Sequence, residues 1–184
     1  MFTSCRNLTS FSSDLRSLTD GSEMFHYCEN LESFSADLRS LTDASHMFGN
    51  CKKLTSFNAD LRRLTQGSHM FDNCSKLESF TSDLRRLTHG WGMFSDCTAL
   101  TSFSADLSSL IDGRWMFRDC KLDAPSVQNI ANTINDLNSK GETGEINIGH
   151  ATDVPLSIVN ECGNKLIDKG WTVYFNDTLY NKVN

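Results

Sequence analysis

Residues 1–23 read MFTSCRNLTSFSSDLRSLTDGSE, and residues 24–46 read MFHYCENLESFSADLRSLTDASH, which is nearly the same sequence again. This 23-residue unit recurs without insertion, and all six methionines mark the starts of its copies: Met1, Met24, Met47, Met70, Met93 and Met116. Counted from each Met, the template is M-F-x-x-C-x-x-L-x-S-F-x-[AS]-D-L-x-x-L-[TI]-x-x-x-x. Five full copies agree, so the fold of most of the chain is that of a repeat.

The apolar offsets within a unit change period, and this change indicates where the secondary structure lies. Met, Phe, Cys and Leu at unit positions 1, 2, 5 and 8 fit one helical stripe. They predict a short α or 3₁₀ turn, with the preceding serine as its N-cap (Ser22, Ser45 and Ser68). Positions 9–13 alternate, as Phe11 does with Ser10 and Ser12, which predicts a strand. Leu15 and Leu18 then face inward around a bend.

A period of about 20 to 29 residues with Leu and Phe at fixed offsets is typical of leucine-rich-repeat solenoids, whose units bury their apolar faces by stacking. We therefore predict an α/β repeat, specifically a right-handed leucine-rich-repeat solenoid with a parallel sheet. Residues 1–121 should form this array, with five 23-residue units and the start of a sixth.

The pattern changes at Lys121, and residues 122–184 are expected to form a C-terminal α/β capping region. Apolar spacing and the placement of Pro and Gly predict helices over residues 125–138 and 155–169. Strands are predicted over 145–149 and 171–176, with a frayed end over 177–184. A helix-strand-helix-strand order would close the open end of a parallel sheet.

The segment M-F-x-x-C-x-x-L-x-S-F resembles the BspA-type leucine-rich repeats of bacterial surface proteins, over residues 1 to about 121. The resemblance implies an adhesive or binding module on a cell surface or in a secreted protein, and similar repeats occur in gut bacteria and their phages. This unit has Asp-Leu where many such repeats have an apolar residue and Pro. No particular ligand can therefore be carried over.

Composition argues against several classes of function. The formal net charge is −6, and nucleic-acid binding normally needs a basic face, so we expect no nucleic-acid partner. The longest apolar runs are only a few residues, which predicts no membrane insertion. No export signal precedes the repeats, so the sequence itself also leaves a cytoplasmic location open.

Six of the seven cysteines occupy unit position 5: Cys5, Cys28, Cys51, Cys74, Cys97 and Cys120. Their 23-residue spacing does not match a zinc site. Units usually lie far apart on the helical side of a solenoid, which argues against disulfides. We expect a structural column of buried free thiols, and the same state for Cys162.

Catalysis and metal binding find little support. His46 and His69 share a unit position, but no third ligand is specified by spacing. Ser, His and Asp are frequent because the template uses them, and no nucleophile elbow, phosphate-binding loop or paired-acid motif is present. We expect no enzymatic activity, no cofactor and no metal.

Two charged columns lie two positions apart: Asp14, Asp37, Asp60, Asp83 and Asp106, and Arg16, Arg39, Arg62 and Arg85. One interpretation is structural, with interleaved Asp and Arg ladders or with Asp accepting backbone N–H bonds at the bend. The other is a polar stripe for a partner, reinforced by Arg63 and Arg86.

Recognition is expected where the units differ, and positions 20–23 bring Trp91, Arg114 and Trp115 into adjacent turns. The alternative, which we favour from sequence, is that the two tryptophans cover the junction with the C-terminal cap. The candidate binding residues are Trp91, Arg114, Trp115, Arg62, Arg63, Arg85 and Arg86. They suggest a non-catalytic binding or adhesion module for a protein or glycan, and the alternative function is a structural spacer of a surface or phage-fibre protein.

The first unit has no preceding unit in this sequence to cover its stacking face. An uncovered end would expose apolar side chains and an unpaired strand edge. Two explanations are open: the chain is a fragment or copy of a longer repeat protein, or it forms a homodimer through this end. The dimer would be a two-fold, end-to-end pair that buries Phe2, Leu8 and Phe11 near the contact.

Overall fold

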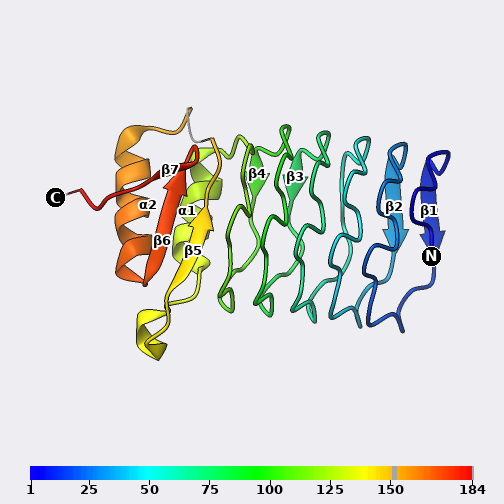
Figure 1. Ribbon diagram of the computed structural model, residues 1–184, viewed down its shortest axis with the longest axis horizontal. Coiled ribbons are helices and arrows are strands. Elements are labelled where there is room, and N and C mark those ends of the chain that lie inside the picture. Colours follow the sequence, from blue (N-terminus) through cyan, green and yellow to red (C-terminus); the bar gives the residue numbers. More distant parts are fainter. Residues whose placement is uncertain (151–152, 184) are drawn as a thin grey trace.

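The computed structural model describes residues 1–150 and 153–183, and it shows a row of stacked units that ends in a cap of helices and strands (Figure 1). The two termini lie at opposite ends of the long axis. The elements in chain order are β1 (Ser10–Ser13), β2 (Ser33–Ala36), β3 (Ser79–Phe80), β4 (Ser102–Phe103), α1 (Ala124–Thr133), the 3₁₀ turn η1 (Asn138–Lys140), β5 (Gly144–Asn147), α2 (Leu156–Asp168), β6 (Trp171–Phe175) and β7 (Thr178–Leu179).

Short parallel strands form inside the predicted window of four units, but they do not make one continuous sheet. β1 pairs with β2 and β3 with β4, each with Phe opposite Phe, as in Phe11 opposite Phe34. The third unit has no strand in this window, although Phe57 still stacks on Phe34 with ring centroids 5.9 Å apart. The prediction of parallel strands is therefore confirmed in four units, and the sheet is interrupted at the third.

The predicted helical turn at the start of each unit is wrong. The chain from position 21 of one unit to position 4 of the next, here called the turn segment, is a series of overlapping turns, such as the one closed by the His26 N–H bond to the Glu23 carbonyl. Positions 23 and 4 have positive φ, for example 56° at Glu23 and 59° at Tyr27, which a right-handed helix does not allow. The serines at position 22 are therefore not N-caps.

Alternate N–H groups of the turn segment donate to the next unit instead of to their own turn. Phe25 donates to Met47 and Tyr27 to Gly49, each at 2.9 Å, and the same bonds recur in the following units. These bonds hold successive units close together on this side of the array too. The wide spacing expected for a helical side is therefore absent.

The core consists of two ladders of phenylalanine rings. At unit position 2, successive rings are parallel with centroids 5.4–5.6 Å apart, as for Phe48 and Phe71. The rings at position 11 stack in the same way, and rings of the two ladders meet edge to face, as Phe57 and Phe71 do at 4.8 Å. Columns of Met and Leu fill the rest of the interior and are fully buried in the central units.

All seven cysteines are free thiols, as expected, and only Cys5 is exposed. Each later member of the column donates its thiol to the carbonyl oxygen of the Phe in the preceding unit, as Cys74 does to Phe48 at 3.2 Å. Burial raises the pKa of the Cys74 and Cys97 thiols. The expected buried column is confirmed from Cys28 onwards, whereas Cys5 is exposed because no unit precedes it here.

The C-terminal region packs against the last units of the array with the predicted order of helix, strand, helix and strand, and it adds the 3₁₀ turn η1 and the strand β7. Asp123 caps α1 by accepting the Ser126 N–H at 2.9 Å, and Ser126 Oγ in turn accepts the N–H of Phe103 from β4 at 2.8 Å. The helix α1 ends at Thr133 and not at residue 138. The expected frayed end contains β7, which pairs antiparallel with β6; residue 184 lies outside the described residues.

No helix among the described residues has the length and apolar character needed to cross a membrane.

Candidate binding surface

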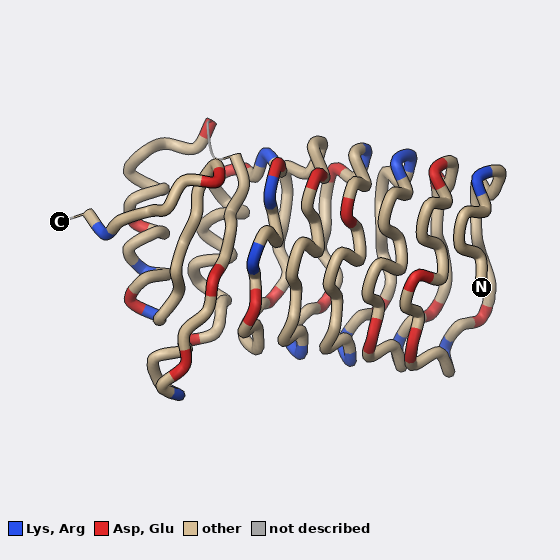
Figure 2. Tube along the Cα trace, in the orientation of Figure 1, with Lys and Arg blue, Asp and Glu red and all other residues tan. Residues whose placement is uncertain are grey.

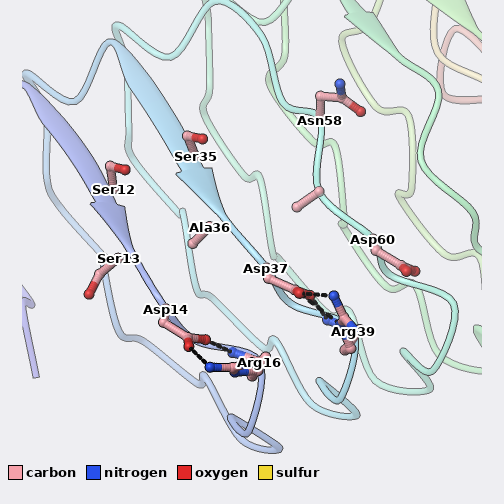
Figure 3. Close-up of a pocket in the computed structure, with 11 residues that line it drawn as sticks. Ser12, Ser13, Asp14, Arg16, Ser35, Ala36, Asp37, Arg39, Asn58 and Asp60 are labelled. Atoms are coloured by element: carbon pink, nitrogen blue, oxygen red, sulfur yellow. Dashed lines mark hydrogen bonds and ion pairs between the residues drawn. The ribbon is translucent and has the colours of Figure 1, made fainter.

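The candidate arginines at positions 16 and 17 lie on the bend that follows the strand window. Asp37 accepts the backbone N–H of Arg39 at 3.0 Å and bonds its guanidinium, and Figure 3 shows the same arrangement for Asp14 and Arg16. The hydrogen bonds from Arg39 lower the pKa of Asp37. The Asp side chains thus accept backbone N–H bonds at the bend, which is one of the two structural roles considered for them. The other role, an interleaved ladder of Asp and Arg between units, is not formed, because each Asp pairs within its own unit.

A shallow groove of about 760 Å³ runs along these bends over the first three units (Figure 3). Its lining is small and polar, with Ser35, Ala36 and Asn58 beside the Asp and Arg side chains. The four candidate arginines are exposed at this bend, and Arg62 and Arg85 pair with Asp60 and Asp83. Arg63 and Arg86 have no ion pair among the described residues, and acidic and basic residues are interspersed along the array (Figure 2). Exposed pairs such as that of Arg62 and Asp60 contribute little binding energy of their own.

A different face carries a row of neighbouring aromatic and imidazole rings, which we call the ring stripe. It runs along the turn segments and comprises Tyr27, His26, His46, His69, Trp91 and Trp115. Neighbouring ring centroids are 4.2 to 5.9 Å apart, and the His46 and His69 rings are nearly parallel. The candidate residues Trp91, Arg114 and Trp115 are thus brought together, and they are separate from the four candidate arginines of the bend.

Several of these rings occupy backbone positions that disfavour large side chains. The φ angle is 57° at His46, 55° at His69 and 54° at Trp115, a region in which glycine is preferred and a bulky residue costs about 1–3 kcal/mol. Gly92 occupies the same unit position, and a Cβ there would lie 2.6 Å from the His69 ring. The rings of the stripe thus occupy positions whose backbone favours glycine, and glycine is present at position 92, where the His69 ring needs the space.

Arginine side chains fix the tryptophan end of the ring stripe. The Arg114 guanidinium lies 5.5 Å from the Trp91 ring centroid and is held there by Asp112, which accepts from its Nη2 at 2.7 Å. Arg118 lies over the Trp115 ring at 5.7 Å. These contacts are typical of cation–π interactions and orient both indoles.

His46 lies between His26 and His69 in the ring stripe. Burial lowers the pKa of His46, and the neighbouring His69 and His26 lower it further.

Trp91 is 38% exposed and Trp115 is 46% exposed. β5 hydrogen-bonds to the turn segment at residues 113–119 and α1 packs on β4, so contacts other than the indoles also hold the junction. The expectation that the two tryptophans help to cover the cap junction stays a prediction, and Trp115 borders the cap residues Glu145 and Tyr174.

A hollow of about 360 Å³ lies at the end of the ring stripe, between the array and the cap sheet. We call it the junction hollow; its lining residues are Trp115, Arg118, Glu145, Asn147, Tyr174 and Asp177. Of these residues, only Trp115 is among the candidate binding residues named from the sequence. The other residues carry no motif, and they reach the hollow because β5 adds to the array and β6 adds to β5.

A family model for the BspA-type leucine-rich-repeat region, with six copies, matches residues 19–139, which is more than half of the chain. The chain belongs to the BspA-type leucine-rich-repeat family. The matched region extends past Lys121 and includes α1. The comparisons with curated proteins and with solved structures each found no match.

The BspA-type family is surface-associated and typically non-catalytic. The residues described here contain no group of three or more His, Cys, Asp or Glu side chains arranged to hold a metal ion. The family assignment confirms the predicted repeat type and leaves the partner to be argued from the surface.

Proposed function

We propose that this BspA-type chain is a non-catalytic binding module at a cell surface and that the ring stripe contacts its partner, a protein or a glycan. The observation that carries the proposal is the exposure of Trp91 and Trp115 at positions where the units differ. Tryptophan and arginine are the side chains that most often dominate binding energy at interfaces.

The array has sources of stability other than these side chains. Stacking is already provided by the two phenylalanine ladders and by the hydrogen bonds of the turn segments. A pure spacer could therefore carry glycine or asparagine at position 23, where positive φ favours them. Large rings at that position are better explained by a role outside the core.

The spacer remains the second candidate, because hydrogen bonds join successive units both through the strands and through the turn segments. Such an array would be a stiff rod that could separate two other parts of a surface or fibre protein. A spacer would need no exposed tryptophan, which is why we place it second. Nucleic acid is not proposed as a partner, given the net charge of −6.

The test is a parallel screen of the chain on a glycan array and a protein array. The stripe variant W91A/R114A/W115A should lose a ligand that the unchanged chain and the exposed-lysine control Lys140→Ala both retain. A second variant, R62A/R63A/R85A/R86A, examines the bend. Absence of any ligand on both arrays would favour the spacer, and a loss confined to the bend variant would move the binding surface there.

A further inference from the structure

The junction hollow arises from a mismatch between the array and the cap strand. In the preceding units the turn segment bonds residue for residue, since Gly90, Gly92 and Phe94 donate to Asp112, Arg114 and Met116. At the cap, Gly113 donates to Glu145 and Phe117 donates to Asn147. The two donors are therefore four residues apart in the array, whereas their two acceptors are only two residues apart in the extended strand β5.

Trp115 lies between the two donors and has no matching residue on β5. Its counterparts at position 23, such as His69, donate their backbone N–H to the following unit, at 2.8 Å for His69. Within the described residues, the Trp115 N–H has no acceptor. In the other units this N–H points toward the following unit. The Trp115 N–H therefore lies on the side of the array that faces β5 and borders the hollow.

The lining of the hollow combines two aromatic rings with side chains that can donate and accept hydrogen bonds. The half-exposed indole of Trp115 faces a space also bordered by Tyr174 of β6. Glu145 and Asn147 alternate along β5, so both lie on the same face of the cap sheet as Tyr174, which is opposite Asn147. A volume of about 360 Å³ is at the low end of the range for small-molecule sites.

The polar groups of the hollow are only partly satisfied by one another. Asn147 donates to Asp177 at 2.7 Å, and Arg118 Nε lies 3.6 Å from a carboxylate oxygen of Asp177. The described residues provide no hydrogen-bond partner for the Glu145 carboxylate or for the Tyr174 hydroxyl. Two carboxylates and one guanidinium give the lining a formal charge of −1, from Glu145, Asp177 and Arg118, which disfavours an anionic ligand.

We propose that the junction hollow binds one or two rings of a neutral saccharide. The C–H groups on one face of a pyranose ring pack on the electron-rich face of an aromatic ring, here Trp115 with Tyr174 beside it. The sugar hydroxyls donate to the carboxylates of Glu145 and Asp177, and they accept from the Arg118 guanidinium and from the backbone N–H of Trp115. This inference rests on the proposed function, because it names the ligand class for one end of the ring stripe.

The experiment screens the chain against neutral and sialylated oligosaccharides on one array and then measures the affinity for the best neutral glycan by calorimetry. Trp115→Ala should weaken binding at least tenfold, and Glu145→Gln should weaken it at least threefold. The matched control is Glu142→Gln, the same charge change three residues earlier at an exposed position outside the lining, and it should bind within twofold of the unchanged chain. Circular dichroism melting confirms that each variant is folded.

Three results would overturn the proposal: no neutral glycan is bound, only sialylated glycans are bound, or Glu145→Gln binds as well as Glu142→Gln. The glutamate pair keeps the test valid even if Trp115→Ala fails to fold, since Glu145→Gln breaks no hydrogen bond or ion pair among the described residues and removes only a longer-range attraction to Arg114. A protein ligand that the stripe variant loses, without any glycan binding, would leave the proposed function intact and refute the saccharide.

Discussion

Replacing Phe71 tests the packing that holds the array together. Phe71 is fully buried and contacts four other rings: it stacks on Phe48 and Phe94 at 5.5 Å and meets Phe57 and Phe80 edge to face at 4.8 and 5.6 Å. Removing a buried Phe side chain typically costs about 3–5 kcal/mol. With four ring pairs lost as well, Phe71→Ala should lie at the upper end, about 5 kcal/mol.

Two further variants separate burial from ring stacking. Phe71→Leu keeps most of the apolar volume and loses the four pairs, so it should cost about 2 kcal/mol at about 0.5 kcal/mol per pair. Phe2→Ala removes a half-buried ring that pairs with two other rings among the described residues, Phe11 and Phe25, and should cost no more than about 2 kcal/mol. Urea unfolding followed by tryptophan fluorescence gives these values. Equal losses for Phe71→Ala and Phe2→Ala would refute the ladder as the main source of stability.

Three other outcomes are expected. A thiol reagent should label one cysteine per chain under native conditions, the exposed Cys5, and the other six only in denaturant; labelling of several at once would contradict the buried column. Because the pKa of His46 is lowered in the folded chain, its stability contribution is complete above about pH 6.5 and falls as the pH drops through the lowered value. The urea midpoint of His46→Asn should therefore fall less between pH 7.5 and 5.5 than that of the unchanged chain, and an equal fall would argue against this assignment. We also propose that the chain as given associates through the end that bears Leu8, so sedimentation should show a concentration-dependent dimer that Leu8→Glu abolishes, and a monomer at all concentrations would exclude the end-to-end pair.

The 23-residue period was sufficient to predict the repeat type, the strand window and the buried thiols, because each of these depends on stacking identical units. The turn segment was mispredicted because apolar residues at positions 1, 2, 5 and 8 fit a helical stripe equally well. A signal for the correct structure was present: position 4 carries Asn50, Asn73, Asp96 and Asp119, the residue types that tolerate positive φ.

The junction hollow could not be predicted from the repeat. It depends on where β5 enters the array and on how many residues of the turn segment at residues 113–119 it matches, and both are set by packing of the cap. Glu145, Tyr174 and Asp177 are also far from Trp115 in the sequence, and no spacing rule connects them.

The three tryptophans of this chain allow the central claim, that the ring stripe is the binding surface, to be tested in one measurement. Each indole N–H gives one signal in a two-dimensional ¹⁵N–¹H NMR spectrum, and the chain has only Trp91, Trp115 and Trp171. Trp171 is an internal control, because it is 3% exposed and its indole donates to the Asn135 carbonyl at 2.9 Å. On titration with a ligand selected on the arrays, the Trp91 and Trp115 signals should shift with one common affinity while Trp171 stays unchanged. Saturated binding with no shift of Trp91 or Trp115 would contradict the account.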